Sequence, residues 1–94
     1  MFCEKSTFWK PDNNYFLRTV THYLVGRLCA IEGDELIFDN ATWIADTGRY
    51  TQFILNGTVS EAEPYPPDMR VLVNRTALID ACAWLHDLKM GQRL

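Results

Sequence analysis

The chain has 94 residues, of which 48% are hydrophobic and 22% are charged, a composition typical of one small globular domain and not of a disordered segment. Nine Lys and Arg residues against twelve Asp and Glu residues give a net charge of −3, which disfavours nonspecific attraction to nucleic-acid backbones. A domain of this size buries only about 60–65% of its surface, so we expect it to associate with itself as a homo-oligomer.

The first stretch of the chain is aromatic but shows no period. It ends in Pro11-Asp12-Asn13-Asn14, a cluster that favours a turn before regular structure begins. We therefore expect residues 1–14 to form an N-terminal arm and residues 15–94 to form a single domain.

Residues 15–31 predict β-structure because they are rich in β-branched and aromatic side chains. The run is too long for one ordinary strand. A break near Thr21 or a bend near Gly26 is expected, since glycine inside a strand often marks a bulge. In an extended chain, one side of this run carries the apolar residues Phe16, Val20, Leu24 and Leu28.

The following segment predicts a hairpin. Glu32-Gly33-Asp34 supplies a tight connection between two apolar runs. Residues 36–38 and 43–45 then form either a strand pair or one long strand that is interrupted at Asp39-Asn40.

Residues 46–57 change to a helical period. The i, i+3, i+4 spacing is carried by Tyr50, Phe53 and Ile54. Asp46 or Thr47 is placed to cap the start of the helix, and Gly57 is placed to end it. The segment therefore predicts one short helix.

The C-terminal part predicts three further strands. Residues 59–63 form a short strand, a proline-rich loop follows, and residues 69–73 form the next strand. Residues 77–84 are ambiguous, because their apolar positions also suit one face of a helix. We prefer a strand, since the segment follows a tight polar break and a barrel needs a closing strand.

The cysteines and the apolar runs suggest where the protein works. Cys3, Cys29 and Cys82 are far apart and have neither CxxC spacing nor a nearby histidine at zinc-ligand spacing. We expect free thiols in a reducing compartment. The N-terminus lacks the apolar centre of a signal peptide, and no later run approaches the ~20 apolar residues of a membrane span. We therefore expect a cytoplasmic protein with no membrane partner.

No enzyme signature is present. An apolar run followed by Asp46-Thr47-Gly48 resembles the catalytic loop of aspartic proteases, but Arg49 stands where that family usually has a small residue, and turn or helix-cap chemistry is the simpler interpretation. His22 and His86 have no nucleophile or third metal ligand at a useful spacing, and no phosphate-binding, dinucleotide-binding or hydrolase motif occurs. We therefore predict no catalysis, no metal and no cofactor.

A set of polar and aromatic residues is left as the candidate ligand site. Arginines beside aromatic faces can stack on a nucleobase while their guanidinium groups hold a phosphate. Such a set can equally be core packing with a salt-bridged rim. The set also includes Trp84. The residues that we predict to bind the ligand are Tyr23, Arg27, Trp43, Arg49, Asn74 and Arg75.

Two segments resemble the motifs of Sm-like proteins. Residues 19–44 are similar to the first motif, through Val25-Gly26-Arg27-Leu28 and the acidic turn after it, and residues 69–82 are similar to the second, with Asn74-Arg75 at its short break. The resemblance implies a mainly β (α+β) fold, a small and strongly bent Sm/SH3-like β-barrel with one short helix. It also implies that barrels associate through edge strands into a ring, with ligands at subunit junctions.

Residues 39–50, 57–66 and 74–84 are also similar to small, functionally uncharacterised proteins of bacteria and their phages. That resemblance implies a phage protein in the host cytoplasm. Together these features predict a non-catalytic oligomer that holds a nucleotide-type ligand, a signalling nucleotide or a short RNA, and that evades host defence by sequestering it. The alternative is an interaction module that binds and inhibits a host protein without a small ligand.

Overall fold

The computed structural model describes residues 8–88, and these residues form a mainly β domain with one short helix. The elements in chain order are β1 (Asn14–Thr19), β2 (Tyr23–Glu32), β3 (Glu35–Asp46), α1 (Tyr50–Asn56), β4 (Glu61–Pro64), β5 (Val71–Asn74), the 3-10 helix η1 (Arg75–Ala77) and β6 (Leu78–Ala83). The fold class predicted from the sequence is confirmed.

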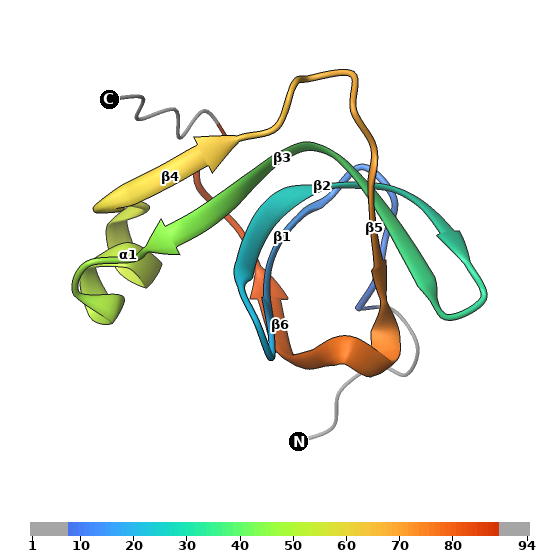
Figure 1. The fold of residues 1–94 in the computed structure, drawn as a ribbon, viewed down its shortest axis with the longest axis horizontal. Helices are drawn as coiled ribbons and strands as arrows, with labels where there is room; N and C mark the ends of the chain where they lie inside the picture. The colour runs from blue at the N-terminus through green and yellow to red at the C-terminus, as the bar shows by residue number, and fades with distance from the viewer. Residues whose placement is uncertain (1–7, 89–94) are drawn as a thin grey trace.

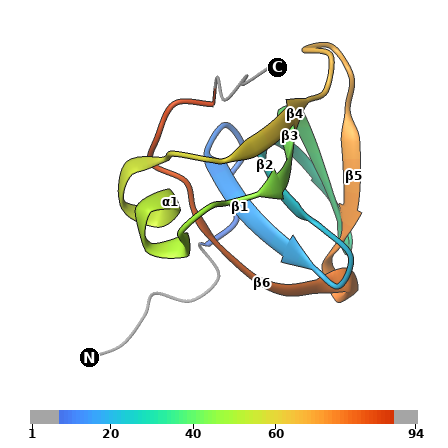
Figure 2. The ribbon, with the colours of Figure 1, turned by 60° about the vertical axis from the view of Figure 1, so that its left-hand side comes forward.

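The strands form one strongly bent antiparallel sheet in the order β4-β3-β2-β1-β6 (Figure 1). The long strand β3 pairs with β5 through residues 35–38 and with β4 through residues 42–46. Between residues 8 and 88 the sheet does not close into the expected barrel, because β6 pairs only with β1 and β4 pairs only with β3. η1 separates β5 from β6, and the chain crosses to β1 instead of returning beside β5 (Figure 2).

The predicted break and the predicted bend between residues 15 and 31 are both present. β1 ends at Thr19, whose Oγ1 accepts hydrogen bonds from the amides of Thr21 and His22. Val20 therefore lies in a turn and is 81% exposed, so its expected place on an apolar strand face is wrong. In β2 the register shifts at Gly26, where a Cβ atom would lie 3.3 Å from the Cα of Ala41. Glycine thus allows β2 and the bent part of β3 to approach closely.

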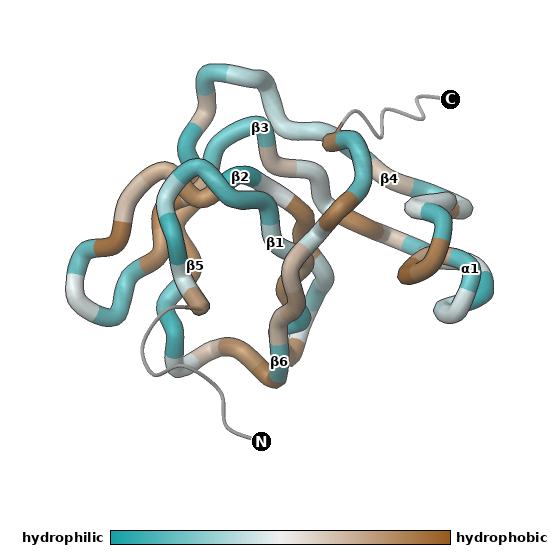
Figure 3. The backbone as a smooth tube through the Cα atoms, turned by 180° about the vertical axis from the view of Figure 1, so that it is seen from behind, coloured by the Kyte–Doolittle hydropathy of each residue, from teal (hydrophilic) through white to brown (hydrophobic). Residues whose placement is uncertain are grey.

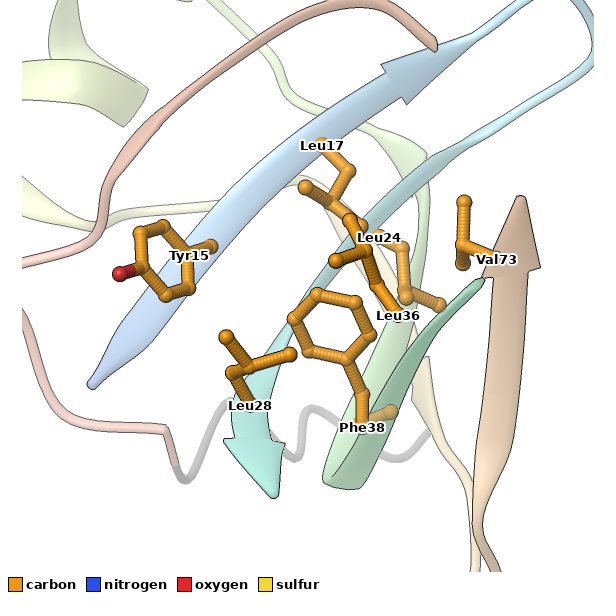
Figure 4. Close-up of a cluster of buried hydrophobic side chains, with 8 residues drawn as sticks. Tyr15, Leu17, Leu24, Leu28, Leu36, Phe38 and Val73 are labelled. Carbon is orange, nitrogen blue, oxygen red and sulfur yellow. The ribbon is translucent and has the colours of Figure 1, made fainter. Parts of the chain in front are cut away.

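Two hydrophobic clusters lie on opposite faces of the sheet. The first lies inside the curve between β1, β2, β3 and β5 (Figure 4), and the second lies between the sheet and α1. Because successive side chains of a strand point to opposite faces, Tyr15 and Leu17 belong to the first cluster while Phe16 belongs to the second. The second cluster also holds Phe53 of α1 and Trp84, which follows β6. Trp84 is therefore a core residue and not part of a ligand pocket.

The helix begins later than its predicted caps. The N-cap of α1 is Arg49, and no side chain caps the helix. The carboxylate of Asp46 instead accepts a hydrogen bond from the amide of Gly48 at 2.9 Å, which closes a local turn before the helix. Gly57 ends the helix in the left-handed conformation, as predicted.

The part of the predicted arm that the structure describes packs on the sheet. The hydroxyl of Tyr15 donates to the carbonyl of Phe8 at 2.6 Å and accepts from the amide of Lys10. Trp9 packs against the first cluster. Residues 1–7 of the predicted arm lie outside the described residues.

The three C-terminal strands follow the sequence prediction with shifted ends. β4 and β5 begin two residues later than expected, and β6 settles the ambiguity of residues 77–84 in favour of a strand. Cys29 and Cys82 are free, as predicted, and both are half-buried.

Candidate functional site

The six predicted ligand residues lie at separate places. Arg27 of β2 is used within the chain: its Nε and Nη2 donate to the two carboxylate oxygens of Asp39 at 3.0 and 2.6 Å, and its Nη1 donates to Asp12 at 2.7 Å. The hydrogen bonds that Arg27 donates to Asp39 raise the pKa of Arg27. A guanidinium held by two carboxylates has little positive potential left for a phosphate.

Asn74 and Arg75 also make local structural contacts. The Oδ1 of Asn74 accepts hydrogen bonds from the amide and the hydroxyl of Thr76 at 3.0 and 2.7 Å. The guanidinium of Arg75 donates to the carbonyl of Gly33 at 2.9 Å, and its backbone amide donates to the carbonyl of Asp34. These bonds fix the turn after β5 against the turn between β2 and β3, so both residues serve the local structure of these turns.

Tyr23 and Trp43 share one surface groove, which we call the Trp43 groove. It lies between the β1–β2 turn and the C-terminal half of β3 and has a volume of about 420 Å³. Trp43 is 39% exposed, although it pairs in the sheet with the fully buried Leu24. The groove is lined by residues 19–23 and 43–47.

Several of the residues that line the groove together with Trp43 are polar. Nδ1 of His22 lies 3.0 Å from the hydroxyl of Thr21. At the other end of the groove, the hydroxyl of Thr47 donates to the carbonyl of Gly48, and Asp46 closes the turn described above. The lining of the groove therefore combines hydroxyl, imidazole and carboxylate side chains with an aromatic one.

Arg49 lies next to this groove in the chain. It follows Thr47 by two residues, it is exposed, and within residues 8–88 its guanidinium makes no hydrogen bond or ion pair. Of the three arginines predicted from the sequence, it alone has no carboxylate or carbonyl partner for its guanidinium among residues 8–88. Two of the six predicted residues, Tyr23 and Trp43, thus line the Trp43 groove, and Arg49 follows its last lining residue, Thr47, by two positions in the chain.

A second polar cluster was missed by the sequence analysis. Arg18 of β1 donates from Nε and Nη2 to the two oxygens of Asp80 at 2.8 and 2.5 Å, and the hydrogen bond to Asp80 raises the pKa of Arg18. The hydrogen bond from Arg18 lowers the pKa of Asp80, and burial raises the pKa of the neighbouring Tyr50. The ion pair joins β1 to β6, which are far apart in sequence. The alternation of side chains along β1 indicates which face Arg18 lies on, but it does not identify Asp80 as its partner.

The candidate catalytic features do not assemble. Asp46 of the Asp-Thr-Gly triplet serves its own turn. His86 lies far along the chain from His22, and its Nε2 is 2.8 Å from the carbonyl of Ile54 at the end of α1. Among the residues that the structure describes, no group of three or more His, Cys, Asp or Glu side chains is arranged to hold a metal ion.

No helix in residues 8–88 is long and apolar enough to cross a membrane. Comparison with protein-family models, with curated proteins and with solved structures finds no match for this chain.

Proposed function

We propose that this chain is a non-catalytic binding protein that holds a small nucleotide in the Trp43 groove. The observation that carries the proposal is the partly exposed indole of Trp43 on the wall of a groove of about 420 Å³. Small-molecule sites commonly measure about 300–1,000 Å³ and combine aromatic walls with a few polar groups.

The groups around the groove suit the parts of a nucleotide. A nucleobase stacks on the indole of Trp43, an interaction worth about 1–3 kcal/mol per base. The hydroxyl oxygen of Thr47 and the second ring nitrogen of His22, which the bonds described above leave open, can bind ribose and base edges. The guanidinium of Arg49 can pair with a phosphate.

A small nucleotide fits this arrangement better than a short RNA. RNA binding by charge needs several free cations along a surface, whereas Arg27 and Arg75 already face Asp39 and Asp34. The net charge of −3 opposes a long polyanion further. One free arginine is sufficient for one phosphate.

The resemblance to phage proteins suggests which biological role such binding would have. A protein that binds a host signalling nucleotide without converting it lowers the free concentration of that nucleotide, and this would counter a host defence. Self-association would place several grooves on one particle. In the alternative, a host protein binds to this chain and the groove holds no nucleotide.

The experiment mixes the purified protein with a nucleotide extract of bacterial cells and records native mass spectra. The ligand identified by its added mass is then titrated by calorimetry into the unchanged protein, Trp43→Ala and Arg75→Ala. We expect Trp43→Ala to weaken binding about 5- to 150-fold, which corresponds to the loss of about 1–3 kcal/mol. Arg75→Ala is the matched control and should bind normally, because its guanidinium contacts Gly33.

Spectra without added mass, or equal affinity in Trp43→Ala, would contradict the proposal. Loss of binding in Arg75→Ala with normal binding in Trp43→Ala would move the site to the β5–η1 turn.

A further inference from the structure

The three outer strands of the sheet differ in how their free edges are protected. β4 carries Glu61, Glu63 and Pro64, and charges and proline are the usual devices that stop an edge strand from pairing with another chain. β5 has only four residues. β6 has six residues and contains no proline and no lysine. Its one charged residue, Asp80, is neutralised by Arg18.

The backbone of β6 presents unpaired groups along this edge. The amide of Trp84 donates to the carbonyl of Asn14 at 2.9 Å. Because hydrogen-bonded pairs alternate in an antiparallel ladder, Cys82 and Asp80 also direct their backbone groups toward β1. The N–H and C=O groups of Ala81 and Ala83 therefore point away from β1, where no other strand lies between residues 8 and 88.

The side chains of β6 leave room for a second strand. Ala81 and Ala83 are small, and Figure 3 shows that most of β6 is hydrophobic. Ile79, the extra residue of a bulge opposite the Arg18–Thr19 step, is 59% exposed. A large exposed isoleucine beside an unpaired edge gains from being covered.

We propose that two copies of this chain pair antiparallel through β6, with a two-fold axis at Ala81. In this register Asp80 lies opposite the partner's Cys82, and Ile79 lies opposite the partner's Ala83. No like charges face each other, and the sheet continues from one copy into the next. The edge is therefore complementary to itself, which favours a second copy over an unrelated peptide.

The contact is narrow, since it rests on one short strand from each copy. Interfaces that bury less than about 1,200 Å² are typical of weak and reversible complexes. We therefore expect a monomer–dimer equilibrium that depends on protein concentration. This pairing requires no ligand in the Trp43 groove, so it stands or falls separately from the proposed function.

The test combines sedimentation of the full chain over a concentration series with amide hydrogen exchange by NMR. We expect a monomer–dimer equilibrium, and slower exchange of the amides of Ala81 and Ala83 as the concentration rises. Ala83→Pro removes an outward donor without removing a bond to β1, and Ile79→Lys adds a gatekeeper charge to the edge. Each should weaken the dimer at least tenfold. Leu72→Lys, which replaces a 53% exposed apolar residue on β5, is the matched control and should dimerise normally.

A chain that stays monomeric at all concentrations overturns the proposal. A larger closed ring overturns it as well, because a two-fold contact ends at two copies. A dimer that Leu72→Lys disrupts while Ala83→Pro and Ile79→Lys leave it intact assigns the interface to β5 instead. Circular dichroism of each variant establishes that it is folded before its association is compared.

Discussion

Replacement of Gly57 by alanine probes the contact between the end of α1 and the C-terminal segment. Gly57 has φ +74°, and a Cβ atom there would lie 2.9 Å from Cβ and Cγ of His86. The left-handed conformation costs a residue with a Cβ about 1–2 kcal/mol. Moving His86 away also removes its hydrogen bond to the carbonyl of Ile54, a loss of about 1 kcal/mol. We expect Gly57→Ala to lower the free energy of unfolding by about 2–3 kcal/mol.

The measurement is urea unfolding followed by tryptophan fluorescence, to which the buried Trp84 contributes. Gly33→Ala is the control, because Gly33 has φ +63° and its added Cβ would meet nothing within 4 Å. It should lose only the conformational part, about 1–2 kcal/mol. Both changes reduce the entropy of the unfolded chain equally, so their difference reports the contact with His86.

Equal losses for the two glycine variants would refute the packing of His86 on the helix end. The same reasoning is checked in a His86→Gly background, where both atoms that meet the new Cβ are gone. There Gly57→Ala should cost no more than Gly33→Ala, and an unchanged larger loss would mean that something other than His86 opposes the added methyl group.

Three further results are expected from the core and from two titrating groups. Phe53→Ala should lower the free energy of unfolding in urea by about 3–5 kcal/mol, because Phe53 is fully buried. Leu55→Ala on the same helix should lower it by under about 0.5 kcal/mol, because Leu55 is 66% exposed. Similar losses for the two variants would mean that α1 does not pack on the sheet. Because Arg18 lowers the folded-state pKa of Asp80 below its ordinary value of 3.8, this pair contributes stability above that pH and loses it as the pH falls through the folded-state pKa; Asp80→Asn should therefore flatten the acid side of the stability curve, and an identical curve would exclude the contribution. Burial raises the pKa of the Cys82 thiol, so iodoacetamide at pH 8 should alkylate Cys82 more slowly in the folded chain than in urea, as read by peptide mass spectrometry, and equal rates would contradict its burial.

The sequence predicted most of the strands because their signals are local. Apolar runs bounded by glycine, proline or Asn-Asp pairs mark where the chain extends and where it turns, and the break at Thr21, the bend at Gly26 and the end of α1 at Gly57 all follow from such signals. The predicted helix cap was wrong because the carboxylate of Asp46 can accept either from a helix amide or from a nearer amide in the preceding turn. Its carboxylate binds the amide of Gly48, two residues on, and this turn delays the helix.

The candidate site was harder to predict because register decides which side chains meet. A regular hairpin around Gly33-Asp34 would place Arg27 opposite Asn40. The register shift between Leu28 and Ala30 instead brings Asp39 opposite Arg27, and an arginine that looked free in the sequence becomes part of an ion pair. A bulge of one residue leaves no clear mark in the sequence, and pairings between distant strands such as β1 and β6 leave even less.

β1 contributes side chains to both hydrophobic clusters, one on each face of the sheet. Phe16 and Leu17 are neighbours in sequence, yet each is fixed in a different cluster. Neither half of the domain can open without exposing one face of this strand, so partial unfolding of one cluster should weaken the other at once. The domain should therefore lose its structure in a single cooperative step, with the backbone amides of these two residues opening at the same free energy.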